Sequence, residues 1–151
     1  MVCPFCMNKS TSVYNSRQTV RLNNVWRRRR CDKCKKVFTT NESVDPGSVI
    51  KVTGIRTIKP FSQTTLLLSI FKICDHIDNP EVAAQYITQT VLQKLYKLAT
   101  KNYQLVAKED IIATVLTTLK PYNLAAYIKY LSYYAPEIDS RTLNRKLKAI
   151  S

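Results

Sequence analysis

The sequence predicts an α+β fold, in which an N-terminal zinc-binding β-ribbon is followed by a domain of one β-hairpin and four helices. Two C-x2-C pairs within the first 45 residues predict the ribbon, because each pair can turn two sulfurs toward one metal ion. Beyond residue 62, apolar residues recur at steps of three and four, which is the period of an amphipathic helix. A chain of 151 residues is long enough for one small metal-held module and one domain with its own core.

Four cysteines, Cys3, Cys6, Cys31 and Cys34, have the spacing of a tetrahedral four-thiolate zinc site. A disulfide framework would need an oxidising compartment, and the N-terminal residues show no secretory signal, so we expect reduced thiols. A thioredoxin-like redox motif would need a surrounding βαβ pattern, which is missing here. We therefore predict one structural Zn²⁺ ion. The fifth cysteine, Cys74, stands in an apolar run and is expected to be a buried core thiol.

The segment between the cysteine pairs predicts two short strands and a row of exposed arginines. Residues 12–15 and 25–27 contain β-branched and aromatic residues, and a turn at residues 22–24 joins them. Four consecutive arginines, residues 27–30, precede the second cysteine pair. Because alternate side chains of a strand face opposite sides, some of these arginines must be exposed. Arginine binds phosphate or the guanine edge with two hydrogen bonds, so we predict nucleic-acid binding; a merely solvated surface is the alternative.

The chain is strongly basic, with 24 Lys and Arg against 10 Asp and Glu and a formal net charge of +14. Half of that excess, +7, lies in residues 1–45, which are under a third of the chain. Such a concentration is typical of a nucleic-acid-binding module, although a generally basic surface is the simpler alternative. No apolar run is long enough for a transmembrane helix, and two glycines exclude the P-loop and Rossmann phosphate-binding patterns.

A turn cluster at residues 45–48 predicts the boundary between the two domains. After it, residues 49–52 and 55–58 are expected to pair as a hairpin about a turn at residues 53–54. The predicted parts are therefore a ribbon domain at residues 1–45, a second domain at 46–139 and a basic C-terminal tail at 140–151.

Apolar periodicity predicts four helices in the second domain, over residues 63–77, 80–101, 111–119 and 124–134. Ser62 is the expected N-cap of the first helix, Pro80 opens the second, and Pro121 ends the third. The residues expected to face inward from the second helix are Val82, Ala83, Tyr86, Val91, Leu95 and Leu98. After residue 136, a short basic amphipathic helix is expected.

Segments along most of the chain also match a known family. They are Cys3-Pro4-Phe5-Cys6, Ser16-Arg17, the arginine run before Cys31, Phe38-Thr39-Thr40 with Glu42, Val49-Ile50-Lys51, Pro60-Phe61, and Ala126-Tyr127-Ile128-Lys129 before Tyr134. Together, and to about residue 139, these segments resemble the bacterial NrdR family of transcriptional repressors of ribonucleotide reductase genes. The resemblance implies that residues 1–45 are a DNA-binding zinc ribbon and that residues 46–139 are an ATP-cone.

The resemblance further implies a repressor and not an enzyme, acting in the bacterial cytoplasm and on the nucleoid. It implies binding to palindromic promoter boxes in double-stranded DNA by a homo-oligomer, with ATP and dATP as allosteric effectors and no membrane partner. Together with the exposed arginine run, it gives Arg17, Arg27, Arg28, Arg29 and Arg30 as the candidate DNA-binding residues.

The nucleotide site implied by the resemblance departs from the family pattern. Val52, Thr53 and Thr65 stand where arginine, aspartate and lysine are usual, so two phosphate-facing cations are replaced. We hypothesise that Arg56 or Lys59, on the same hairpin, supplies the lost charge. Together with these two hypothesised cations, the candidate nucleotide-binding residues are Val49, Lys51, Arg56, Lys59, Glu42, Tyr127 and Tyr134. For the two tyrosines core packing is the alternative, and for Glu42 a contact that braces the domains.

Two other functions remain open. ATP-cones also occur as regulatory domains of ribonucleotide reductase, so a fragment of that enzyme is one alternative. Against it, the chain has no further cysteine set for radical chemistry, and His76 beside Asp75 suits a surface or cap role. The other alternative is a structural zinc-ribbon module that binds nucleic acid and whose helical domain has lost nucleotide control.

Overall fold

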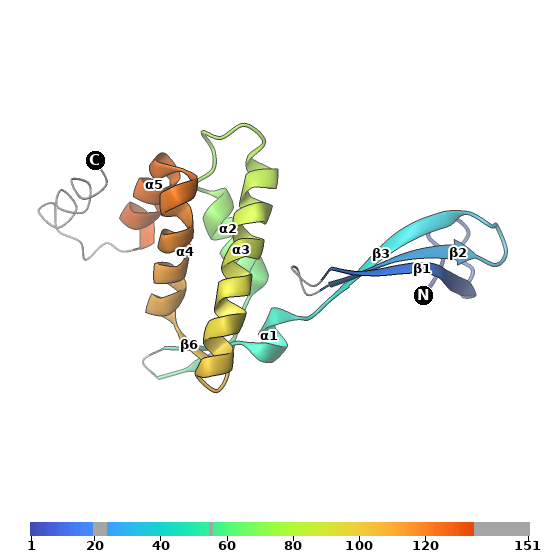
Figure 1. Cartoon of the computed structure of the whole chain (residues 1–151), viewed down its shortest axis with the longest axis horizontal. Helices are drawn as coiled ribbons and strands as arrows, with labels where there is room; N and C mark the ends of the chain where they lie inside the picture. The colour runs from blue at the N-terminus through green and yellow to red at the C-terminus, as the bar shows by residue number, and fades with distance from the viewer. Residues whose placement is uncertain (20–23, 55, 135–151) are drawn as a thin grey trace, which may run out of the picture. The chain divides into compact units, whose positions relative to one another are not determined.

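The computed structural model describes residues 1–19, 24–54 and 56–134, which fall into two compact units. The first unit is Met1–Asp45, and the second begins at Pro46 (Figure 1). The described residues of the first unit form only strands and two cysteine turns, whereas those of the second form a small sheet and the helices. These elements confirm the predicted α+β fold. The tail helix expected after residue 136 lies outside the described residues.

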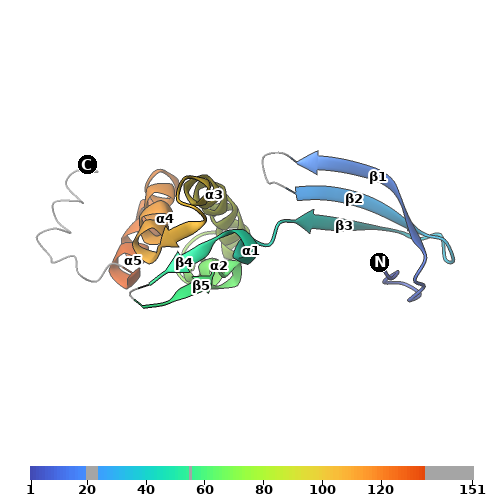
Figure 2. The same ribbon diagram turned by 90° about the horizontal axis from the view of Figure 1, so that it is seen from below.

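The first unit is a three-stranded antiparallel sheet in the order β1-β2-β3 (Figure 2). Its strands are Thr11–Thr19, Asn24–Cys31 and Val37–Ser43. β1 and β2 contain the predicted segments 12–15 and 25–27 but are longer, and β3 is absent from the sequence prediction. Most residues of β1 and β3 are exposed, whichever face of the sheet they lie on. These strands therefore lack the alternation of apolar and polar residues by which a strand is recognised in sequence. Of the turn expected at 22–24, only Asn24 is described, and it begins β2.

The second unit begins with the one-turn helix α1 and a small mixed sheet in the order β5-β4-β6. The bounds are Pro46–Val49 for α1, Lys51–Thr53 for β4, Ile58–Pro60 for β5 and Leu105–Ala107 for β6. The hairpin is present, but its strands start later than the predicted residues 49 and 55. Val49 is taken up by α1, and the Gly54 N–H donates to the Thr57 carbonyl at 2.8 Å, which lengthens the turn. β6, which pairs in parallel with β4, is absent from the sequence prediction.

Four longer helices follow: α2 at Gln63–Phe71, α3 at Pro80–Lys101, α4 at Lys108–Tyr122 and α5 at Leu124–Tyr134. The bounds of α3 and α5 are those predicted. Ser62 caps α2 as expected, its Oγ accepting from the Thr65 N–H at 3.2 Å. α4 begins before the predicted residue 111 and ends one residue after Pro121, close to the end that this proline predicts.

α2 ends at Phe71, well before the predicted residue 77. The backbone N–H groups of Ile73, Cys74 and Ile77 each donate to a carbonyl three residues earlier. Such tight turns keep apolar side chains at steps of three and four without continuing the α-helix. The periodicity in the sequence therefore located the buried residues and misplaced the end of the helix.

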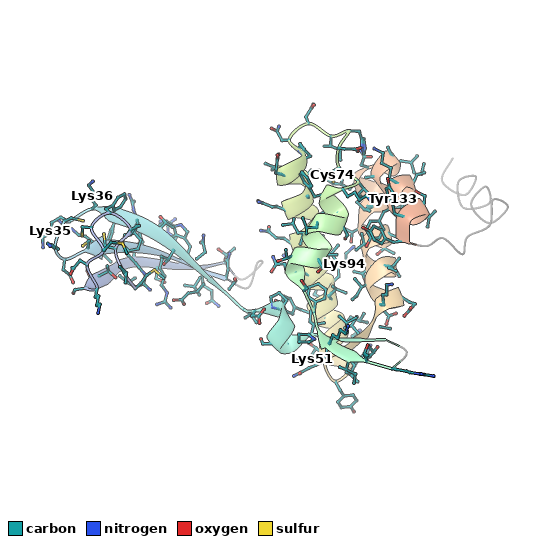
Figure 3. All side chains as sticks on the ribbon, turned by 180° about the vertical axis from the view of Figure 1, so that it is seen from behind. Lys35, Lys36, Lys51, Cys74, Lys94 and Tyr133 are labelled. Atoms are coloured by element: carbon teal, nitrogen blue, oxygen red, sulfur yellow. The ribbon has the colours of Figure 1, made fainter. Side chains whose placement is uncertain are left out.

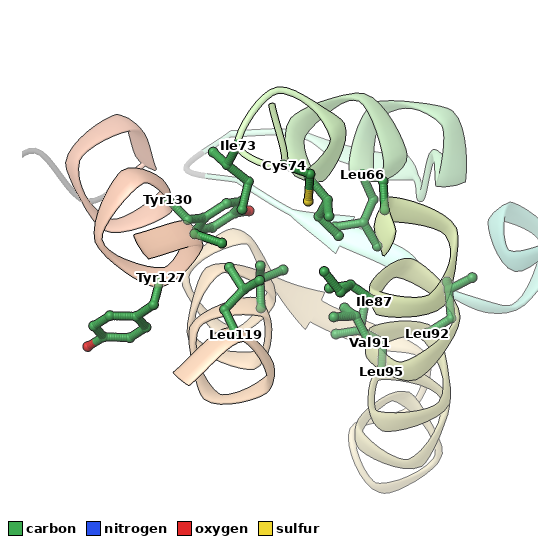
Figure 4. Packing of buried hydrophobic residues seen from close by; sticks show 14 of the residues in the cluster. Leu66, Ile73, Cys74, Ile87, Val91, Leu92, Leu95, Leu119, Tyr127 and Tyr130 are labelled. Atoms are coloured by element: carbon green, nitrogen blue, oxygen red, sulfur yellow. The ribbon is translucent and has the colours of Figure 1, made fainter. Parts of the chain in front are cut away.

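The core of the second unit lies between α2, α3, α4 and α5 (Figure 4). From α3 it takes Ala83, Ile87, Val91 and Leu95, which recur at helical spacing. The predictions of Val82 and Tyr86 as inward residues are wrong, because these side chains are 67% and 58% exposed on the opposite side of α3. Cys74 is fully buried, as predicted. Within the part of the chain that the structure describes, no helix is both long and apolar enough to cross a membrane.

Candidate metal centre and nucleic-acid interface

The four predicted zinc ligands converge on one point of the first unit. The sulfur atoms of Cys3, Cys6, Cys31 and Cys34 all lie within 4.8 Å of one another. The Cys3 and Cys34 sulfurs are 3.7 Å apart, and those of Cys6 and Cys31 are 3.6 Å apart. A zinc ion with four Zn–S bonds of about 2.3 Å requires sulfur–sulfur distances of roughly 3.8 Å. The four thiols, none of which is in a disulfide, therefore fit one structural Zn²⁺ ion.

The two cysteine pairs share one backbone geometry. The Met7 N–H donates to the Cys3 carbonyl at 2.9 Å, and the Lys35 N–H donates to the Cys31 carbonyl at 3.0 Å. Met7 and Lys35, each directly after its pair, have positive φ angles of 56° and 59°. This geometry turns backbone donors toward sulfur, as where the Phe5 N–H donates to Cys3 Sγ at 3.4 Å. Such donors favour the thiolate form that binds metal.

The thiols of the second pair differ in acidity. The backbone N–H of Cys34 is the main cause that lowers the pKa of Cys31 to about 6. At Cys34 the backbone N–H of Lys36 acts in the same direction, but burial and the neighbouring sulfurs raise the pKa to about 11. The cluster therefore holds thiol protons that a bound metal ion displaces.

β2 directs its four arginines to two sides of the sheet. Arg28 and Arg30 are exposed, whereas Arg27 and Arg29 are half-buried. Arg27 Nη2 lies 2.9 Å from Glu42 Oε2, and Arg29 Nη2 lies 3.9 Å from Glu42 Oε1. Among the residues that the structure describes, Arg28 and Arg30 have no ion pair. The four arginines therefore lie in two different environments, one pair beside the Glu42 carboxylate and the other pair exposed.

Arg17, the fifth residue predicted to bind DNA, lies on β1 opposite Trp26 of β2. Asn41 of β3 is the partner of Trp26 on the other side. Arg17, Trp26 and Asn41, together with Thr19 and Asn24, line a hollow of about 300 Å³. Asn41 is absent from the predicted set because only the register of β3, which the sequence did not predict, places it beside Trp26.

Four of the predicted nucleotide-binding residues lie in or beside the β4–β5 hairpin. Val49 ends α1 and packs against the core. Lys51 Nζ donates to the Gly47 carbonyl of α1 at 3.0 Å, at the foot of the helices (Figure 3). Arg56 in the turn and Lys59 on β5 are exposed. One short hairpin thus carries three cations.

The two predicted tyrosines lie on α5, which packs against α4. Tyr127 is buried, and the ring centroid of Tyr134 lies 4.5 Å from that of Tyr130. Burial is the main cause that raises the pKa of Tyr130 to about 12. Figure 3 shows Tyr133, beside Tyr134 in the chain, well away from Lys51. Both predicted tyrosines therefore have packing partners, and the C-terminal end of α5 does not meet Lys51.

Thr65, a position where the family pattern has a cation, and Glu42, a predicted nucleotide-binding residue, each have other partners. Thr65, which replaces a usual lysine, donates its hydroxyl to Ser62 Oγ at 3.0 Å and belongs to the cap of α2. Glu42 lies on β3 of the first unit, where its carboxylate is paired with Arg27 and Arg29. Both side chains therefore have partners within their own units.

The single histidine joins a polar cluster in the second unit. His76 Nδ1 lies 3.2 Å from Asp75 Oδ1, and His76 Nε2 lies 3.1 Å from Asn123 Oδ1. Asn123 Oδ1 also accepts from the Ala126 N–H at 2.9 Å, which caps α5. Lys129 donates a hydrogen bond to Asp75 and lowers the pKa of that carboxyl. His76 therefore supports a helix cap, the role predicted for it.

Known proteins resemble both units. Residues 1–42 match the family model described as "Transcriptional repressor NrdR-like, N-terminal domain". A Gloeobacter violaceus protein named "Transcriptional repressor NrdR" is 34% identical over 136 residues, which cover 89% of this chain and 76% of the relative. Proteins of the same name from Lachnoclostridium phytofermentans and Streptococcus pneumoniae are 27% and 29% identical. These two alignments cover 99% and 100% of this chain, and 96% and 94% of the relatives.

Proposed function

Because the chain belongs to the family of NrdR transcriptional repressors, we propose that it binds promoter DNA through its zinc ribbon and represses ribonucleotide reductase genes. The observation that supports this most directly is the position of Cys31, which is both a metal ligand and the last residue of the arginine strand β2. The bound ion cross-links the two cysteine turns and undergoes no chemistry of its own. It therefore fixes the end of the strand that presents the arginines.

The repressor acts in the cytoplasm as a homo-oligomer on palindromic promoter boxes. A palindrome repeats its half-site about a two-fold axis, so two ribbons related by symmetry must bind it. Each ribbon supplies cations for the phosphates and polar side chains for the base edges. A monomer would contact only half of such a site.

ATP and dATP control this assembly through the second unit. The β4–β5 hairpin supplies Lys51, Arg56 and Lys59, and a triphosphate needs several cationic or N–H donors. Arg56 or Lys59 replaces the charge that is lost where the family pattern has cations at positions 52 and 65. Arg56→Ala or Lys59→Ala should weaken nucleotide binding in calorimetry more than Lys101→Ala, an exposed lysine at the end of α3. Equal affinities in the three variants would eliminate this role.

One anisotropy experiment tests the proposed function. The zinc-loaded chain is titrated onto labelled duplex DNA from upstream of the ribonucleotide reductase genes of its own genome, and onto a scrambled duplex, at one salt concentration. Each titration is repeated with ATP, with dATP and without nucleotide. Selective binding that is tightest with dATP is the expected result. Equal binding to both duplexes would reject the repressor in favour of a structural nucleic-acid module.

A repressor without nucleotide control is the second candidate. Its support is Thr65, whose hydroxyl serves the cap of α2 at a position where the family has a lysine. Lys51 is likewise bonded to the carbonyl of Gly47. In this case the duplex titrations show sequence selectivity that neither ATP nor dATP alters.

A further inference from the structure

The register of the ribbon divides its side chains between two faces. Directly opposed residues of antiparallel strands share a face, and side chains alternate along each strand. The open face is defined by the even-numbered residues of β2 and their partners, among them Arg17, Trp26, Arg28, Arg30, Thr39 and Asn41. The clamped face is defined by the odd-numbered residues of β2 and their partners, among them Gln18, Val25, Arg27, Arg29, Thr40 and Glu42.

The arginines of the clamped face are bonded within the sheet. Arg27 is 2.9 Å from the Glu42 carboxylate, and Arg29 is 3.9 Å from it. Arg29 Nε donates to Thr40 Oγ1 at 3.1 Å, and the side chain of Arg29 is only 14% exposed. To bind a phosphate, these guanidinium groups would have to leave their partners, and the Glu42 carboxylate would repel the incoming charge. The clamped face is therefore poorly suited to a polyanion.

The open face has the opposite electrostatics. Glu42 is the one acid in the described strands β1, β2 and β3, so no strand residue of the open face is acidic. Arg28 and Arg30 are exposed, and the Arg28 guanidinium lies 5.9 Å from the ring centroid of Tyr14. The acid nearest to Arg30 in the sequence is Asp32, in the cysteine turn. Its carboxylate accepts a hydrogen bond from Ser12 Oγ at 3.3 Å and, within the described part of the chain, forms no ion pair with either arginine. Two guanidinium groups here thus face solvent without a carboxylate partner among the described residues.

The open face also has groups suited to bases. Arg17, Trp26 and Asn41 line the hollow of about 300 Å³ on this face. Arginine and asparagine side chains form paired hydrogen bonds with guanine and adenine edges, respectively. The indole of Trp26 offers an apolar surface for a thymine methyl group or a sugar. Phosphate-binding and base-contacting groups therefore share one face.

We propose that DNA lies against the open face and is contacted by Arg17, Arg28 and Arg30. Arg27 and Arg29 are positioning residues, which hold β2 to β3 through Glu42. This inference rests on the proposed function and deepens it, because it assigns two different roles to an uninterrupted run of four arginines.

Single arginine variants of the zinc-loaded full chain test the assignment. Each variant is titrated by anisotropy onto one promoter duplex between about 50 and 200 mM salt. Arg28→Ala and Arg30→Ala are expected to weaken binding about tenfold and to reduce the salt slope by about one. Arg27→Ala and Arg29→Ala, the matched controls from the same strand, should change affinity less than about threefold and leave the slope unchanged.

A second pair of variants avoids any loss of packing. Thr39 and Gln18 are both exposed, but Thr39 opposes Arg28 on the open face and Gln18 opposes Val25 on the clamped face. Thr39→Glu should weaken DNA binding by at least about tenfold, since its carboxylate faces the phosphates. Gln18→Glu adds the same charge and should weaken binding by less than about threefold. Bound zinc and tryptophan emission verify that every variant is folded.

The outcomes separate the assignment from the proposed function. If the chain binds DNA but clamped-face and open-face variants lose equal affinity, or the clamped-face variants lose more, the assignment is overturned and the DNA-binding function stands. If the unaltered zinc-loaded chain binds no DNA, both are overturned. Loss confined to the open-face variants supports the assignment.

Discussion

Removal of zinc is expected to unfold the first unit and to leave the second folded. The buried core cluster begins at Ile50 and contains no residue of the first unit. Among the described residues of the first unit, the buried apolar side chains are those of Cys3 and Cys31, both of them metal ligands. Without the ion, the ribbon buries too little apolar surface to offset the conformational entropy of its chain.

The free energy lost with the ion is large compared with the stability of the ribbon. Structural zinc sites contribute about 10–16 kcal/mol of binding free energy, whereas an entire small domain is stable by only about 5–15 kcal/mol. Loss of the ion should therefore unfold the ribbon completely rather than loosen it. The four longer helices, of 9, 22, 15 and 11 residues, all lie in the second unit and should keep their far-ultraviolet ellipticity.

Trp26 makes the assay specific, because it is the one tryptophan of the chain and lies half-buried in β2. A chelator, or Cys34→Ser, should shift its emission to the red while the helical ellipticity stays constant. Cys74→Ser, the same substitution outside the metal site, should retain the zinc and the native tryptophan emission. Loss of ellipticity together with the emission shift would refute the independence of the two units. Native emission after complete zinc removal would refute the dependence on metal.

Three further predictions concern the second unit and the cysteine turns. Leu95→Ala removes a fully buried side chain of α3 and should lower the free energy of unfolding, measured in urea, by about 2–5 kcal/mol. Val82 lies on the same helix and is 67% exposed, so Val82→Ala should change this free energy by less than about 0.5 kcal/mol. Lys35→Gly relieves a positive φ of 59° and should raise the unfolding midpoint of the zinc-loaded ribbon, followed by tryptophan emission; a lower midpoint would contradict this. Because Lys129 holds the pKa of Asp75 below its ordinary value of 3.8, that carboxylate stabilises the fold above about pH 4 and ceases to do so as the pH falls through its folded-state pKa. The stability difference between the unaltered chain and Asp75→Asn should therefore vanish in acid, and a constant difference would contradict this linkage.

The elements that the sequence predicted correctly have local causes. Proline at the first position fixed the start of α3, and Ser62 fixed that of α2. Metal-ligand spacing located the four sulfurs, since the turn between paired cysteines depends only on neighbouring residues. In each case the information lies within a few residues of the feature.

The elements that escaped prediction depend on partners distant in the sequence. β6 is three residues long and exists because β4 pairs with it, and β3 is recognisable only once it lies beside β2. The division of the arginine run follows from the same cause. Alternation along β2 is predictable, but which pair of arginines meets an acid is decided by the register that brings Glu42 to Arg27 and Arg29.

The parallel pairing of β4 with β6 also sets the order in which the chain can fold during synthesis. Residues 51–53 join residues 105–107, and α2 and α3 lie between them, so this sheet closes a long loop. The ribbon has all four ligands once residue 34 has left the ribosome, and its last strand ends at Ser43. Zinc can therefore order the ribbon while most of the second unit is untranslated. The hairpin with Lys51, in contrast, waits for Ala107 before its sheet is complete.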